Sequence, residues 1–398
     1  MQQIMKKNYA LITGLGAISA AGNNLAETLD SFACMKRNAG PVSLFDTPLK
    51  YPVFEVKEIS GEFYLEGQRT LSLALCAVEE ALKEAHLNDK LSKLRIGVCM
   101  GTTVASQLND LEFYKSYRNS GSAPMAAVDR YLKRNLAEFI SRKIKAKGPS
   151  LTVVNACSSG TDAIGVALTW LNNDLCDIAV AGGADELSRI PLCGFGSLGI
   201  VSSELCAPFD RDRKGLNLGE GAGVLVLETK GSAQHRGISS ELYLAGYGSS
   251  SDAYHLTSPH PEGAGLKTSI KKALTDARVE PQEISFVNAH GTATPENDSV
   301  EGKVLAGIFG TDLKMLSTKG FTGHTLGAAG GLEAVFTASA LREGWIPASI
   351  GFKNKDEAIP LTPVRERTVI NGRYAVSTSL AFGGNNAAIV IGRMREGG

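Results

Sequence analysis

The sequence predicts an α/β fold made of two similar halves, and three observations support this prediction. Apolar runs rich in β-branched residues alternate with helical patterns through all 398 residues. The order of these elements recurs once along the chain, which is the pattern of an internal duplication. Glycine clusters follow several of the strand-like runs, where a chain must turn tightly or approach a ligand closely.

Five strand-like runs and five helical patterns make up this alternation. The strands are expected at residues 9–13, 95–100, 151–155, 177–181 and 223–227. The helices are expected at residues 70–85, 128–146, 160–172, 265–277 and 330–343. Because strands that alternate with helices are typical of βαβ units, a substantial part of the sheet is expected to be parallel.

The duplication is visible as three pairs of segments in the same order. The pairs are residues 95–102 with 284–292, residues 151–167 with 316–337, and residues 178–183 with 375–384. We therefore expect an N-terminal half at residues 1–250 and a C-terminal half at residues 251–398. The first half is longer, and we interpret residues 103–150 as an insertion that caps the site or forms a dimer contact.

Composition excludes some functional classes. Lys plus Arg and Asp plus Glu are both 41, so net charge gives no reason to expect nucleic-acid binding. No apolar run reaches about eighteen residues, so no membrane span is expected. Seven scattered cysteines without a CxxC pair are typical of a reducing compartment, which predicts a cytoplasmic protein.

Cys157 is the most informative residue in the sequence. It follows an apolar run, and Ser158, Ser159 and Gly160 come directly after it, where a helix of small residues begins. A thiol in the first turn of a helix faces unpaired N–H groups and the positive end of the helix dipole, which favours the nucleophilic thiolate. The alternative is an inert core cysteine, but the small neighbours leave room for a thioester.

Two histidines in glycine- and threonine-rich surroundings complete a candidate site. His290 is followed by Gly291 and Thr292 at the end of an expected strand, and His324 lies between glycines 323 and 327. One cysteine and two histidines indicate acyl transfer through a thioester. They could also bind zinc, but a fourth ligand and a metal-type spacing are missing, so no metal is expected.

A lysine and a glycine-rich turn extend the candidate site. Lys319 lies in small and apolar surroundings five residues before His324, and a buried lysine needs a carboxylate partner, for which Glu301 is the candidate. Phe382 and Gly383 follow a strand-like run, so the N–H of Phe382 is a candidate oxyanion donor beside that of Cys157.

No dinucleotide cofactor is expected. Gly14 and Gly16 begin a pattern that resembles a dinucleotide-binding loop, but Ser19 occupies the position of its third glycine. The pattern also lacks a strand that ends in an acidic residue about twenty residues later. We interpret this segment as a tight turn between a strand and a helix.

Together these motifs resemble the β-ketoacyl-acyl-carrier-protein synthases of the thiolase-fold, or condensing-enzyme, superfamily, and especially their elongating type I and II members. The similarity covers nearly the whole chain. It rests on the motifs at residues 13–16, 156–160, 208–213, 219–223, 252–255, 259–263, 290–295, 297–298, 319–324 and 382–384. It implies a five-layered αβαβα thiolase fold, an acyl-carrier-protein partner, and a homodimer or a heterodimer with a paralogue.

The resemblance also implies a role for each candidate residue in a decarboxylating Claisen condensation without a cofactor. Cys157 would carry the acyl group, and His290 and His324 would stabilise the enolate formed from malonyl-carrier protein. Lys319, paired with Glu301, would orient the site electrostatically. The remaining roles are binding of the pantetheine arm by Thr292 and Thr294, and an oxyanion hole and gate at Phe382 and Gly383.

The sequence departs from the family pattern in places that bear on its pathway. Ala381 and Asn385 replace residues of the usual gate motif, and the basic residues that commonly contact the carrier protein are sparse. Such departures favour a polyketide-like or aryl-polyene pathway over housekeeping fatty acid synthesis, with Arg130, Lys133 and Arg134 as substitute docking residues.

Two alternatives to an active synthase follow from the same family. A non-catalytic subunit that shapes chain length in a heterodimer usually lacks the cysteine, whereas this chain has Cys157. A thiolase typically needs a second reactive cysteine near the C-terminus, and no cysteine follows Cys206.

Overall fold

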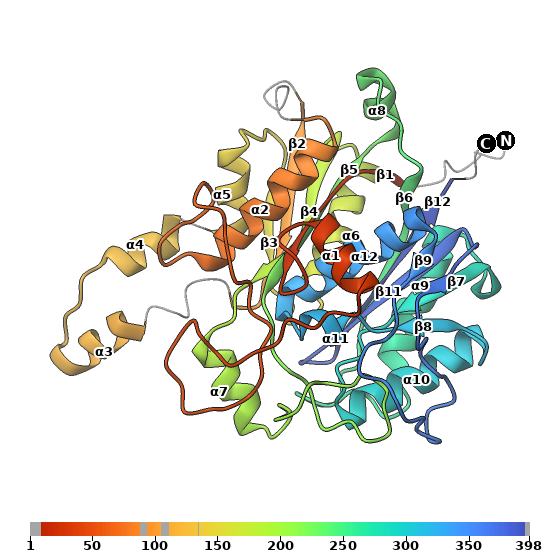
Figure 1. Ribbon diagram of the computed structural model, residues 1–398. Helices are drawn as coiled ribbons and strands as arrows, with labels where there is room; N and C mark the ends of the chain where they lie inside the picture. Colours follow the sequence, from red (N-terminus) through yellow and green to blue (C-terminus); the bar gives the residue numbers. More distant parts are fainter. Residues whose placement is uncertain (1–8, 88–93, 105–110, 134, 395–398) are drawn as a thin grey trace.

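The computed structural model describes residues 9–87, 94–104, 111–133 and 135–394 of the chain (Figure 1). Ten strands form one continuous sheet in the order β3-β2-β4-β5-β1-β6-β12-β11-β7-β8. Their bounds are β1 Ala10–Ser19, β2 Ile96–Gly101, β3 Ser150–Val153, β4 Ile178–Asp185, β5 Gly221–Glu228, β6 Leu242–Ser251, β7 Ile284–Asn288, β8 Lys314–Leu316, β11 Tyr374–Ala381 and β12 Asn385–Arg393. A separate pair joins β9 (Trp345–Ile346) to β10 (Thr368–Val369).

The strand order shows the duplication directly. One half of the sheet has the order β3-β2-β4-β5-β1, and the other, followed from its own edge, has the order β8-β7-β11-β12-β6. The pairing also corresponds, because β2 is parallel to β3 and β4, and β7 is parallel to β8 and β11. The predicted duplicated α/β fold is therefore confirmed. The second half begins with β6 at Leu242, one strand before the expected boundary at residues 250 and 251.

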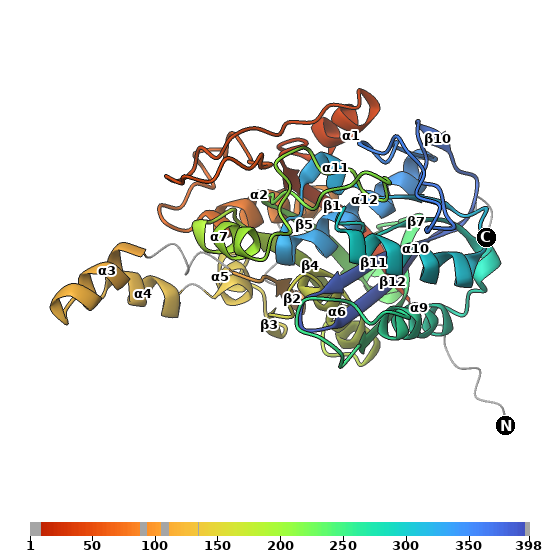
Figure 2. The same ribbon diagram turned by 90° about the horizontal axis from the view of Figure 1, so that it is seen from below.

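The two halves of this sheet alternate with three layers of helices, which gives the expected five layers. The helices are α1 Leu25–Ala33, α2 Arg69–Glu84, α3 Leu111–Ser120, α4 Ala126–Lys133, α5 Leu136–Lys143, α6 Ser159–Asn172, α7 Arg189–Ser197, α8 Lys230–Arg236, α9 Ala264–Ala277, α10 Pro295–Phe309, α11 Lys319–Thr322 and α12 Ala329–Glu343. α6 and α12 contact strands of both halves and form the central layer, whereas α2 covers β1 and β5, and α9 covers β6 and β12 on the outer faces. Figure 2 shows the same arrangement from below.

Small residues let the central layer close. A Cβ atom on Gly331 of α12 would lie 2.5 Å from the carbonyl oxygen of Gly223 and 2.6 Å from the nitrogen of Gly183. A Cβ atom on Gly160 of α6 would in turn lie 2.6 Å from the nitrogen of Gly331. Helix α12 is buried from Ala329 to Leu341. This helix, rich in small residues, therefore lies at the centre of the protein.

The first strand differs from its sequence prediction. Residues 14–16, interpreted as a turn, lie inside β1, which continues to Ser19. A Cβ atom on Gly14 would lie 2.0 Å from the carbonyl oxygen of Ala81 in α2, and one on Gly16 would lie 1.9 Å from that of Ala77. These glycines therefore allow α2 to pack directly on the strand, and they do not form a turn.

The described part of the expected insertion contains three helices, whereas the sequence predicted a single helix at residues 128–146. Asn135 begins α5 as its N-cap, because its side chain accepts a hydrogen bond from the N–H of Glu138 at 3.3 Å. Helices α3 and α4 project away from the body in both views (Figures 1 and 2), and neither lines the cavity at Cys157. Within the described part of the insertion, α3 and α4 therefore do not cap the site; residues 105–110 lie outside the described residues.

In the part of the chain that the structure describes, no helix combines the length and apolar character needed to cross a bilayer.

Stability should depend on the close contact between α12 and the sheet. Gly331→Ala would force a methyl group against the backbone of two strands, so we expect it to lower the free energy of unfolding by about 1–3 kcal/mol or more. Gly231→Ala in α8 is the matched control, because nothing lies within 4 Å of its added Cβ atom. Chemical denaturation of both variants tests this, and equal stability of Gly331→Ala and the wild type would contradict it.

Candidate active site

Cys157 lies on a sharp turn between β3 and α6. Ala156, directly before it, has a φ of +49°, which non-glycine residues rarely adopt. The hydroxyl of Ser159 holds this turn, because it donates to the carbonyl of Ala156 at 2.6 Å and accepts from the N–H of Asn155 at 2.8 Å. Ser158 is the N-cap residue of α6, so Cys157 immediately precedes the helix and does not lie in its first turn.

The protonation of Cys157 differs from the sequence expectation. Burial raises the pKa of the thiol to about 12, although Lys319 and the backbone N–H groups of Phe382 and Cys157 itself act to lower it. The free thiol is therefore protonated at neutral pH, and the position near the helix does not produce a standing thiolate. Both N–H groups lie close enough to the sulfur to act on its charge, and backbone donors beside an acyl-cysteine can stabilise the oxyanion that forms on its carbonyl oxygen.

His324 lies opposite Cys157, with its Nε2 atom 3.0 Å from the sulfur. The backbone fixes its position: its N–H donates to Asn217 at 2.7 Å, and its carbonyl accepts from Gly219 at 3.0 Å. Its Nδ1 atom is buried and has no hydrogen-bond partner among the described residues. Since an unpaired buried N–H costs more than a bare lone pair, we assign the proton to Nε2.

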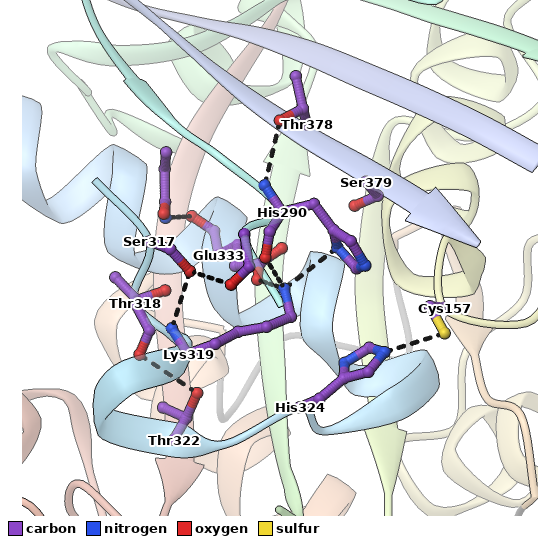
Figure 3. Close-up of polar contacts among 12 residues, drawn as sticks. Cys157, His290, Ser317, Thr318, Lys319, Thr322, His324, Glu333, Thr378 and Ser379 are labelled. Carbon is purple, nitrogen blue, oxygen red and sulfur yellow. Dashed lines mark hydrogen bonds and ion pairs between the residues drawn. The ribbon is translucent and has the colours of Figure 1, made fainter. Parts of the chain in front are cut away.

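His290 lies two residues after the end of β7, and Lys319 fixes its ring in the same tautomer. The Nζ atom of Lys319 lies 3.1 Å from Nδ1 of His290, so Nδ1 accepts and Nε2 carries the proton. The two imidazole rings are nearly perpendicular, with centroids 5.2 Å apart (Figure 3). Burial and the charge of Lys319 lower the pKa of both histidines well below the usual range, so both are neutral hydrogen-bond donors.

The carboxylate partner of Lys319 is Glu333, and the predicted pairing with Glu301 is wrong. The ammonium group of Lys319 forms an ion pair with Glu333 of α12 and donates to the carbonyl of His290 at 2.6 Å (Figure 3). Both side chains are almost completely buried. Burial raises the pKa of Glu333, whereas the charge of Lys319 and its hydrogen bond act to lower it.

Glu301 has a different structural task from the predicted one. Its carboxylate accepts the N–H groups of His290 and Gly291, each at 2.8 Å, and the hydroxyl of Thr378 at 2.7 Å. The residue is completely buried, which raises its pKa. Glu301 therefore fixes the backbone that carries His290, while Glu333 neutralises the lysine.

Glu333 is the site residue that sequence reasoning missed. A signal was present, because Glu333 is the single charged residue between Ala329 and Leu341 in a helix of small and apolar residues. A lone charge on a helix buried on all sides requires a partner. The sequence prediction chose Glu301 from its spacing to His290. The packing of α12 against Lys319, which makes Glu333 the partner, cannot be read from the sequence.

A cavity of about 260 Å³ opens at Cys157 and contains both histidines. Thr292 and Thr294 line it, with their hydroxyl oxygens 2.9 Å apart. Phe382 also lines it and stacks on Phe195 of α7, with ring centroids 5.3 Å apart. Phe195 was not anticipated from the sequence.

Gly383 takes no direct part in the cavity. Its N–H donates to the carbonyl of Leu256 at 2.8 Å, so it holds the turn after Phe382 and is not an oxyanion donor. No cluster of three or more His, Cys, Asp or Glu side chains within the described ranges is arranged to hold a metal ion.

The structure also bears on the expected carrier-protein contacts. Arg69, a basic residue at the start of α2 in a segment where carrier-protein contacts are sparse, forms a two-armed ion pair with buried Glu220 at 2.7 and 2.8 Å, so its charge is neutralised within this protein. The side chains of Arg130 and Lys133, and all of Arg134, lie outside the described residues.

Comparison with known proteins places the whole arrangement in one family. Residues 58–233 match the family model "Beta-ketoacyl synthase, N-terminal domain", and residues 243–353 match "Beta-ketoacyl synthase, C-terminal domain". The 3-oxoacyl-[acyl-carrier-protein] synthase 2 of Staphylococcus aureus (strain N315) is 33% identical over 96% of this chain and 97% of its own length.

Solved structures agree in fold over nearly the whole length. The structure described as the ishigamide ketosynthase/chain length factor is 30% identical, with a TM-score of 0.90 over 98% of this chain and 100% of that chain. A ketosynthase (ApeO) in complex with its chain length factor (ApeC) from Xenorhabdus doucetiae is also 30% identical, with a TM-score of 0.84 over 99% of this chain and 100% of that chain. With both family models matched in order and the thiolase-type duplication present in the sheet, this chain belongs to the β-ketoacyl synthase family.

Proposed function

We propose that this protein is an elongating 3-oxoacyl-[acyl-carrier-protein] synthase, which joins a malonyl unit to an acyl group held on Cys157. One observation carries the proposal. The thiol of Cys157, two neutral imidazole donors and the N–H groups of Cys157 and Phe382 converge on a single cavity. The chain is an acyltransferase of the condensing type by its family.

The first step is acyl transfer to Cys157. The sulfur attacks the thioester carbonyl of an acyl-carrier protein, and the carrier's thiol leaves with the proton that Cys157 gives up. Since burial raises the pKa of Cys157 to about 12, the proton departs during the attack and not before it. The N–H groups of Cys157 and Phe382 stabilise the oxyanion of the tetrahedral intermediate.

The second step is decarboxylation of malonyl-carrier protein. When CO₂ leaves, its bonding electrons form an enolate, and the Nε2–H groups of His290 and His324 donate to the enolate oxygen. No general base is needed, because loss of CO₂ itself generates the carbanion. Burial and the charge of Lys319 keep both imidazoles neutral, which is the state that can donate without carrying a positive charge of its own.

The carbanion then attacks the acyl group on Cys157. The new carbon–carbon bond forms as the carbonyl oxygen becomes an oxyanion in the same two-donor hole. Collapse expels the Cys157 thiolate, which takes a proton from water, and the product leaves as a 3-oxoacyl thioester of the carrier. Thr292 and Thr294 lie along the cavity in a position to hydrogen-bond the amides of the pantetheine arm.

A carrier protein and a second synthase-fold chain are the partners that we propose. The curated relative's name specifies acyl-carrier-protein substrates, and the two solved relatives are assemblies of a ketosynthase with a chain length factor. The likeness to these assemblies supports a polyketide-type pathway. Because Cys157, His290, His324 and Lys319 are all present and assembled, this chain is the catalytic member of any such pair.

The edge strand β3 supports pairing with a second chain. It is the outermost strand of the sheet, and two large apolar residues are exposed on or beside it: Leu151 by 45% and Val154 by 68%. Unpaired edges with exposed apolar side chains are normally covered. We infer that β3 of a second copy or of a paralogue covers this edge.

We also propose a cytoplasmic location. All seven cysteines are unpaired in the structure, including the exposed Cys34 and Cys193, which suits a reducing compartment.

Substitution of the nucleophile separates the two half-reactions. Cys157→Ala should give no acyl-enzyme, measured as no mass gain after incubation with acyl-carrier protein. Cys157→Gln should release CO₂ from malonyl-carrier protein without forming a condensation product. Cys34→Ala, at an exposed cysteine, is the control and should acylate normally. Condensation by either Cys157 variant would refute the proposal.

Removal of the buried cation should change the pH dependence of decarboxylation. Lys319 lowers the pKa of His290 and His324, so in Lys319→Met these values rise and the neutral donors persist only at higher pH. The acid limb of CO₂ release should therefore move upward by about 1–3 pH units. Lys214→Met, at an exposed lysine paired with Glu204, is the control. An acid limb that stays in place would show that Lys319 does not set the protonation of the histidines.

Charge on the edge strand should disrupt the assembly. Leu151→Asp with Val154→Asp would place two unpaired carboxylates in the inferred contact, and we expect a dimeric wild type to become monomeric. Sedimentation velocity measures the mass, and Val369→Asp, at an exposed site on β10, is the control. A wild type that is monomeric, or a double variant that keeps its dimeric mass, would disprove pairing through β3.

A further inference from the structure

A buried carboxylate supports the turn that carries Cys157 from behind. Asp162, in the first turn of α6, is only 5% exposed. Its Oδ2 atom accepts from the side-chain amide of Asn155 at 2.5 Å and from the hydroxyl of Ser158 at 2.8 Å, whose proton Asp162 shares with the carbonyl of Asn155 at 2.9 Å. Asn155 lies two residues before Cys157 and Ser158 directly follows it, so one oxygen atom ties both sides of the nucleophile together.

The second oxygen of Asp162 connects this turn to the other half of the protein. Its Oδ1 atom accepts from the hydroxyl of Tyr247, on β6, at 2.7 Å. The ring of Tyr247 packs directly against Gly165 of α6, where an added Cβ atom would lie only 2.5 Å from ring carbons. Burial and the carboxylate of Asp162 raise the pKa of this phenol, so it remains a hydrogen-bond donor.

The turn needs such support because its backbone is strained. A φ of +49° at Ala156 is unfavourable for a residue with a Cβ atom and persists only where surrounding contacts enforce it. The peptide between Ala156 and Cys157 carries the N–H of Cys157, one of the two backbone N–H groups that act on the sulfur. Relaxation of Ala156 would therefore move the nucleophile and one oxyanion donor at the same time.

A separate set of contacts holds the opposite side of the turn. Thr103 donates its hydroxyl to the carbonyl of Ala156 at 3.0 Å, and its own N–H is held by buried Asp185 at 2.8 Å. Asp185 also accepts from Gly327, in the turn after His324, at 2.7 Å. These contacts fix the carbonyl of Ala156, whereas Asp162 fixes Asn155 and Ser158, which flank the Ala156–Cys157 pair.

We propose that Asp162 is a positioning residue for the condensation, which with Tyr247 holds Cys157 and its N–H in the reactive geometry. This inference rests on the proposed function for its catalytic consequence. Asp162 does not touch the reacting atoms. It acts through Asn155 and Ser158, and its effect should fall on the steps that use Cys157 more than on decarboxylation, which uses His290 and His324.

Three variants separate geometry from charge. Asp162→Ala removes every contact. Asp162→Asn keeps an oxygen toward Asn155 and Ser158, and its amide can donate to Tyr247, so it removes charge and largely keeps geometry. Tyr247→Phe removes only the bond from the second half and keeps the ring. Thr169→Ala, which removes a hydrogen bond within α6 to Gly165, is the control for helix stability.

The first measurement is the rate of Cys157 alkylation by iodoacetamide as a function of pH, resolved by peptide mass spectrometry with exposed Cys34 as internal standard. The groups that bear on the titration of Cys157 are Lys319, Asp185 and His324, and none of these is changed. In Asp162→Ala the N–H groups of Cys157 and Phe382 are less well placed beside the sulfur, so alkylation of Cys157 should slow relative to that of Cys34 across the profile. Asp162→Asn loses the same negative charge but largely keeps the geometry, so it separates this effect from the electrostatic effect of removing a carboxylate. A purely structural role would lower stability and leave this profile unchanged.

The second measurement is single-turnover acylation by an acyl-carrier protein. We expect Asp162→Ala to lower the maximal rate by about 10-fold or more, short of the roughly 10²–10³-fold loss of a whole oxyanion donor, with little change in half-saturation. Asp162→Asn should recover most of this loss, and Tyr247→Phe should show a smaller loss in the same direction. Thr169→Ala should match the wild type.

The outcomes distinguish this inference from the proposed function. An Asp162→Ala protein with the wild-type alkylation profile and an acylation rate within about 3-fold would overturn it. Should Asp162→Ala fail to fold, Tyr247→Phe carries the test, and a wild-type profile and rate in that variant would have the same meaning. If the wild type fails to condense any acyl and malonyl carrier substrates, the proposed function fails, while the alkylation profiles still decide whether Asp162 positions Cys157.

Discussion

The buried ammonium group of Lys319 is the constraint on which the site depends. It is held by the carboxylate of Glu333, by the carbonyl of His290 and by the Nδ1 atom of the same ring. One charge thereby fixes a tautomer, lowers the pKa of two histidines and acts on the thiol of Cys157. A buried ammonium group requires such partners, because an unpaired charge in a protein interior is strongly unfavourable.

The layers of the fold supply what this ion pair needs. Glu333 lies on α12, which is enclosed between the two halves, and Lys319 begins α11 just before the turn that carries His324. Glycines let α12 approach the strands at backbone distance, and the side chains of Lys319 and Glu333 are almost completely buried beneath this contact. The close packing of the central layer is therefore also the electrostatic basis of the site, since charges act more strongly where water is absent.

The fold and most of the site could be predicted from the sequence because both are encoded in local sequence patterns. The repeated order of strands and the small residues around Cys157, His290 and His324 can be read without any tertiary information. The partner of Lys319 could not be read in this way, because two carboxylates were available and only packing selects Glu333. The turn predicted at Gly14 failed for a similar reason: those glycines serve a contact with α2, which lies more than fifty residues away.

The thiol pKa marks a further limit of local reasoning. Proximity to a helix start predicted a thiolate, but the desolvation that accompanies complete burial outweighs the dipole and the nearby cation. Whether a residue lies one position before a helix or inside its first turn is also a tertiary matter, set here by the bonds of Ser159.

The matching order of strands in the two halves has a consequence for how this chemistry is divided. Cys157 follows β3 and precedes α6, and His324 follows β8 and precedes α12, so the two residues occupy equivalent loops of a duplicated unit. The local twofold relation brings those loops face to face, with sulfur and nitrogen 3.0 Å apart. Equivalent positions of the two halves therefore carry different chemistry, a thiol in one and an imidazole in the other, and the duplicated architecture itself supplies the contact between nucleophile and donor.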